Sequence, residues 1–297
     1  MTQNQHFKIF VSLFLFWFMT LVPEQIIKFF CYFFILTLGI IHGSNDLQII
    51  DSFEKESDLK KNGIKSYVSI IIIAILFFIF FKKITFYVFI FLSSYHFGEQ
   101  HFNHKNFEGK YIKNMLQILH GIFLFSILFL NQKNEVTTIS ESLFSIIVSS
   151  NFITVLSILS GLCYAMVLIY NWFLYNDYKT LLEEILNFTF FYILFKATSL
   201  IISFSIYFII WHSIPSIFDQ IEFLYKKKSK SLVILYLKKS SLLWLISLFL
   251  VTLSFIYLKE SILFNSFIFA ILFVISIPHI FIINIMNYYF KNRSRKS

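Results

Sequence analysis

The amino-acid sequence has little charge, glycine, proline or cysteine. Only 14% of its 297 residues are charged, against roughly a quarter in ordinary soluble domains, so a soluble single-domain enzyme is excluded. With seven glycines and three prolines the chain has no flexible linker, and we expect residues 1–297 to form a single transmembrane domain with short loops. The two cysteines, Cys31 and Cys163, lie far apart in apolar runs and predict neither a disulfide nor a cysteine metal site.

Hydrophobic residues dominate instead, at 58% of the chain with 42 phenylalanines. A membrane-spanning helix needs about 20 predominantly apolar residues. The pattern therefore predicts an all-α, polytopic integral membrane helical bundle with eight to ten transmembrane helices. The ten expected spans are residues 7–22, 26–43, 64–81, 84–97, 111–130, 151–172, 181–195, 197–214, 239–258 and 264–289.

The basic residues are unevenly distributed over the loops between these spans. With ten spans, 19 of the 25 lysines and arginines fall on the side that holds both termini, and six fall on the other side. By the positive-inside rule, the sequence predicts a multi-pass protein of the cell (inner) membrane with cytoplasmic N- and C-termini. The basic cluster at residues 226–230 and the basic tail from residue 291 are expected to meet water and anionic lipid of the bilayer, and no nucleic-acid partner is expected.

Histidines are the most informative residues, because ionisable groups are costly in a bilayer. Five of the eight histidines lie within or at the end of predicted spans: His42, His96, His120, His212 and His279. In the predicted topology, the spans that end in His42, His96 and His212 all run toward the cytoplasm. His120 and His279 lie on the order of 15 Å from the same side, at 1.5 Å per residue. The five histidines are therefore expected to converge on one internal pocket.

A pocket of neutral imidazoles suits a transition metal, and an all-histidine set with open coordination positions is plausible for ferrous iron and dioxygen. Carboxylates would fix the imidazole tautomers by accepting the second ring N–H. Asp46, four residues after His42, and Glu99, three residues after His96, are placed for this role.

Other interpretations of the same residues stay open. A single histidine in a membrane protein can be a hydrogen-bonded structural residue between helices. The histidines and Asp46 are also compatible with a membrane transporter or a proton or metal permease. A membrane desaturase or hydroxylase requires several H-x-x-H-H boxes, and only His96, His101 and His104 approach this pattern.

Taken together, the motifs resemble the bacterial Brp/Blh family of β-carotene 15,15′-dioxygenases over about residues 39–280. The motifs, in chain order, are His42-Gly43-x-x-Asp46, Ser94-x-His96-Phe97-Gly98, His120-Gly121, Trp211-His212-Ser213 and Pro278-His279. The resemblance implies an integral membrane Fe(2+) enzyme that cleaves the central double bond of β-carotene with O2 to give two retinal molecules. It also implies that a rhodopsin often receives the retinal.

The resemblance further implies that His42, His96 and His212 bind the iron. Family members carry a further histidine four residues after the histidine that follows the tryptophan, where this chain has Ser216. Either His279 or His101 completes the metal site, or the metal chemistry and the polyene substrate are altered. We favour His279 because it lies deeper in the membrane.

Four other residues are expected around this site. His101, the other candidate for the fourth ligand, stands where the family usually has aspartate. His101 and His120 are both expected next to the metal ligands. Tyr95 and Trp211 are expected in the wall of the substrate pocket.

Overall fold

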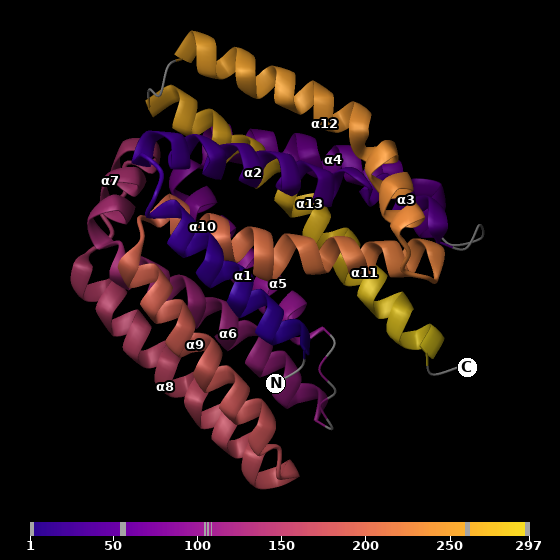
Figure 1. Ribbon diagram of the computed structural model, residues 1–297. Coiled ribbons are helices and arrows are strands. Elements are labelled where there is room, and N and C mark those ends of the chain that lie inside the picture. Colours follow the sequence, from indigo (N-terminus) through magenta and orange to yellow (C-terminus); the bar gives the residue numbers. More distant parts are fainter. Residues whose placement is uncertain are drawn as a thin grey trace. The chain divides into compact units, whose positions relative to one another are not determined.

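The computed structural model describes residues 3–53, 58–103, 105, 107, 109–258 and 262–294, so that His104 and the end of the basic tail lie outside the described residues. The described residues form helices and contain no strand (Figure 1), which confirms the predicted all-α class. The helices, in chain order, are α1 (Gln3–Met19), α2 (Glu24–Ser44), α3 (Asp46–Ser52), α4 (Asp58–Phe80), α5 (Lys82–Phe102), α6 (Lys110–Asn131), α7 (Lys133–Phe144), α8 (Ser150–Tyr175), α9 (Tyr178–Ala197), α10 (Leu200–Ile206), the π-helix η1 (Tyr207–Ser213), α11 (Ile214–Tyr225), α12 (Lys230–Leu258) and α13 (Ile262–Ser294).

Seven helical stretches of the described chain are long and apolar enough to cross a membrane, which supports the predicted membrane protein. They are Glu24–Ser52, Asn62–Phe80, Lys110–Asn131, Ser150–Tyr175, Leu200–Tyr225, Lys230–Ser254 and Phe267–Tyr289. Each coincides with one of the ten expected spans. The other three expected spans are helical as well. However, the apolar helix in α1 is shorter, and α5 and α9 carry polar and charged residues within otherwise apolar sequence.

The expected end of the span 197–214 differs in the structure. Helical backbone continues through α10 and η1 into α11, which ends at Tyr225. Pro215 follows directly after the π-helical turn η1, and the helical backbone passes through it. The proline therefore does not end the span.

The chain divides into two compact units, each built from two separate segments. Unit 1 contains residues 1–33 and 86–212, and unit 2 contains residues 34–85 and 213–297. In unit 1, α6 packs along α8 and α9 (Figure 1). In unit 2, α13 packs along α3, α4 and α12, and α11 contacts α3 and α12.

Two glycines bring α5 and α6 of unit 1 into backbone contact. A Cβ atom on Gly98 would lie 1.7 Å from the backbone oxygen of Gln117, and one on Gly121 would lie 1.7 Å from the backbone oxygen of Ser94. Only glycine permits this approach, because any other residue would place its Cβ inside the neighbouring helix. The glycines of the Phe-Gly and His-Gly motifs thus fix the distance between the helices that carry His96, His101 and His120.

Candidate metal centre

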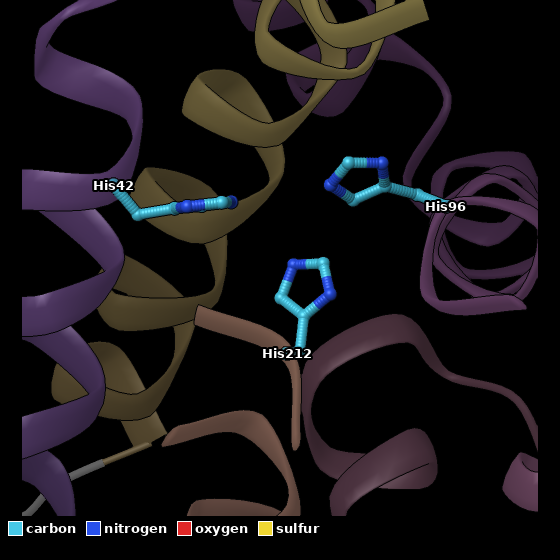
Figure 2. A group of neighbouring side chains, drawn as sticks. All are labelled: His42, His96 and His212. Atoms are coloured by element: carbon cyan, nitrogen blue, oxygen red, sulfur yellow. The ribbon is translucent and has the colours of Figure 1, made fainter. Parts of the chain in front are cut away.

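Unit 1 contains two buried histidines whose rings face each other. His96 lies on α5 and His212 lies in η1, with ring centroids 4.7 Å apart and ring planes nearly perpendicular. Their ligand nitrogens lie within 4.8 Å of one another. Figure 2 shows both side chains, and it also labels His42 of α2, which belongs to unit 2. Two imidazoles at this separation can bind one metal ion.

The π-helix and the aromatic core hold His212. π-helical turns are rare and occur frequently at functional sites, and η1 is the segment that contains His212. The rings of Phe97 and Phe208 lie 4.4 Å and 5.7 Å from the His212 ring. The neighbouring Trp211, expected in a substrate pocket, is buried, and its indole N–H donates to Ser12 Oγ at 3.1 Å.

The other predicted neighbours in unit 1 lie close by. Glu99 is buried, and its Oε2 is 3.9 Å from His96 Nδ1, which is within ion-pair range but too long for a hydrogen bond. Tyr95, also expected in the pocket wall, is half-buried.

Unit 2 contains the second pair of buried histidines, His42 on α2 and His279 on α13. Their Nε2 atoms are 2.7 Å apart, and His279 Nδ1 lies 2.9 Å from Asp46 Oδ1. The Asp46 carboxylate can only accept, so His279 Nδ1 donates, and His279 Nε2 must accept from His42 Nε2. The structure thus brings Asp46 to the ring of His279, giving the carboxylate–imidazole arrangement that orients metal ligands.

Three further residues of unit 2, Tyr67, Gln220 and Tyr236, hold this pair, and sequence reasoning missed them. Tyr67 donates its hydroxyl hydrogen to Asp46 Oδ2 at 3.1 Å. Gln220 donates to the backbone oxygen of His42 at 3.0 Å and receives a hydrogen bond from Tyr236 at 2.7 Å. A Cβ atom on Gly43 would lie 3.1 Å from the Ile275 side chain and 3.9 Å from His279 Nδ1. Only Gly43 had a sequence signal, through its place in the His-Gly motif.

Each unit offers a pair of donors of a type that suits ferrous iron. His42, His96, His212 and His279 are all buried, and neutral imidazole is a good ligand for ferrous iron. In unit 2, His42 Nε2 becomes available to a metal when its hydrogen moves to Nδ1 of the same ring, which leaves both imidazoles neutral.

Ser216 occupies the position at which the resemblance would place a histidine. It is fully buried on α11, and its hydroxyl oxygen has no hydrogen-bond partner among the described residues.

His101 and His120 belong to a different group of side chains, centred on Glu184 of α9. His101 Nε2 lies 2.8 Å from Glu184 Oε1, and the rings of His101 and His120 stack with centroids 4.0 Å apart. His120 Nδ1 lies 3.5 Å from Glu184 Oε2, to which Tyr164 donates at 2.8 Å. Sequence reasoning missed Glu184, although the pair Glu183 and Glu184 in an otherwise apolar segment is a signal that could have found it.

Lys105 supplies the positive charge of this group. Its ammonium lies 2.8 Å from Glu184 Oε1 and 3.2 Å from Glu183 Oε2. Burial lowers the pKa of Lys105, but the Glu184 and Glu183 carboxylates outweigh this effect, so that its pKa is raised above the usual value. Lys105 therefore stays protonated and neutralises part of the buried negative charge.

The helices define an all-α polytopic membrane protein, and each of its two units buries a pair of neighbouring histidines. The family described as beta-carotene 15,15'-dioxygenase matches residues 33–287, and the chain belongs to this family. The expected membership is confirmed, and it supports a dioxygenase-type function on a carotenoid. No curated protein and no solved structure matched the chain.

Proposed function

We propose that the protein is a non-haem Fe(2+) dioxygenase of the cell membrane that cleaves β-carotene centrally with O2, giving two retinal molecules. In this proposal the iron ligands are the four histidines expected from the sequence, His42, His96, His212 and His279. The observation that carries it is the hydrogen-bonded series from His42 through His279 to Asp46. A carboxylate that orients a buried imidazole is typical of metal ligands.

Polar side chains of unit 2 orient the two proposed ligands His42 and His279. Asp46 fixes the tautomer of His279, and Tyr67 holds the carboxylate from its other oxygen. Gln220 holds the backbone of His42 in place. Since these groups are buried, their orientation costs no reorganisation when metal and substrate bind. The bound iron would supply the binding and activation of O2.

The substrate has no charge to be recognised, so that shape and apolar contact must position it. Phe97 and Phe208 place aromatic faces beside His212, where a polyene would be held against the metal. Unit 1 also has an apolar cavity of about 760 Å³ between α6, α8 and α9, a size typical of small-molecule sites. We further propose that β-carotene reaches the site from the bilayer, that both termini are cytoplasmic, and that the retinal passes to a rhodopsin.

The proposal is tested in cells that produce β-carotene, by measuring retinal and the iron bound to the purified protein. We expect His279→Ala to lose both, and Ser216→Ala to keep both. His6→Ala, which alters an exposed histidine of α1, is the control for loss of any histidine. Full iron and retinal in the His279→Ala protein would refute the ligand assignment. Cation transport without oxygen consumption would favour a histidine-lined transporter or permease.

A further inference from the structure

The group formed by His101, His120 and Glu184 has no part in the proposed iron site. Its three members come from α5, α6 and α9, all in unit 1. One ligand atom from each residue lies within 4.8 Å of the other two. Three donors from three helices therefore face one small volume inside a single compact unit.

Burial leaves one ring nitrogen of this arrangement without a partner among the residues that the structure describes. The side chains of His120 and Glu184 are fully buried, and that of His101 is 6% exposed. His120 Nε2 has no hydrogen-bond partner among the described residues. A buried ring nitrogen without a partner costs free energy, because it has given up its hydrogen bonds to water. The ring thus retains a donor or acceptor that a ligand could satisfy.

Two carboxylates share the ammonium of Lys105. Both Glu183 and Glu184 contact this one ammonium. If Glu184 binds a cation, Lys105 can remain paired with Glu183, whose Oε2 is already 3.2 Å away. The ion pair therefore does not compete fully with a metal for Glu184.

We propose that His101, His120 and Glu184 bind a second divalent transition-metal ion, separate from the iron. Two imidazoles and one carboxylate form a ligand set that binds zinc and ferrous iron in proteins. The ion joins α5, α6 and α9, and Tyr164, which donates to Glu184 Oε2, orients the carboxylate.

The test is a Co²⁺ titration of the full chain in detergent after its metals have been removed with a chelator. Bound metal is counted by mass spectrometry, and the cobalt absorption bands report the ligands. We expect the wild-type protein to bind one equivalent more than Glu184→Gln, which keeps the size of the side chain but removes its charge. Glu183→Gln is the matched control, because it alters the other partner of Lys105 and leaves the three donors intact.

A second variant distinguishes loss of a metal ligand from misfolding of Glu184→Gln. His120→Gln is expected to lose the same equivalent and the same absorption bands, with an elution volume in size-exclusion chromatography equal to that of the wild type. His212→Ala is expected to keep this equivalent, which separates the second site from the iron site. Equal cobalt binding by the wild type and Glu184→Gln would overturn the proposal, and so would an equal loss in Glu183→Gln.

Discussion

Replacing Gly121 by alanine tests whether α5 and α6 are in backbone contact. The new Cβ would lie 1.7 Å from the backbone oxygen of Ser94, whereas a relaxed carbon–oxygen contact is about 3.3 Å. The two helices would have to move apart locally by about 1.6 Å. Neither contacting group is the end of a flexible side chain, so rotation of a side chain cannot relieve the clash.

The cost follows from the packing that this separation removes. A gap of 0.5–1 Å already forfeits about a quarter to a half of the dispersion energy of the atoms involved. Alanine regains about 1 kcal/mol over glycine in helix propensity. Overpacking in well-packed cores costs about 1–3 kcal/mol. With a cost at the upper end of this range and the propensity gain subtracted, we expect a net loss of about 2 kcal/mol. The histidines of both helices would be displaced together.

Thermal unfolding in detergent measures this cost, and Gly161→Ala is the matched control. In α8 a Cβ on Gly161 would meet the ring of Phe123 at 2.7 Å, and a ring at the end of a side chain can turn away. We expect the unfolding temperature of Gly121→Ala to fall by about 4–8 °C, at about 2–4 °C per kcal/mol, and that of Gly161→Ala to fall less. Equal unfolding temperatures in the two variants would refute the backbone contact.

Three further predictions concern the charged groups and the metal. Asp46→Asn should weaken iron binding about 10–100-fold, because its carboxylate orients a ligand imidazole; Asp51→Asn, an exposed change on the same helix, should leave the iron content of the purified protein unaltered. Lys105→Met should cost about 3 kcal/mol in denaturant unfolding, since two buried carboxylates lose the ammonium that they share, whereas the exposed Lys110→Met should cost little. A chelator should lower the unfolding temperature, because metal at about 1,000 times its Kd stabilises the folded state by about 4 kcal/mol; an unchanged temperature would contradict tight metal binding.

The helices could be predicted from the sequence because each apolar run has to satisfy its backbone within one segment of a membrane protein. All ten expected spans are helical, and the seven longest apolar ones meet the length and composition of a membrane span. The expected end of the span at residue 214 was wrong, because the helical backbone continues past Pro215 to Tyr225. The sequence pattern does not distinguish a proline that ends a helix from one that lies within it.

The histidines could be found as candidates, but their partners could not. His42 and Asp46 are close in sequence, so their relation to one site was visible. The contact of Asp46 with His279 joins residues 233 positions apart, and no local pattern reports such a separation. Likewise Gln220 and Tyr236 are ordinary polar residues in sequence, and only the packing of α11 on α12 places them beside His42.

The division of unit 2 into two distant segments sets the order in which the protein can be completed during synthesis. His42 and His279 are separated by 237 residues, and a ribosome adds about 5–20 residues per second. His42 and Asp46 therefore enter the membrane on the order of 10 to 50 s before their imidazole partner is made. During this interval the buried carboxylate has to be held by water, lipid headgroups or Tyr67, and the histidine pair is among the last contacts that the growing chain can form.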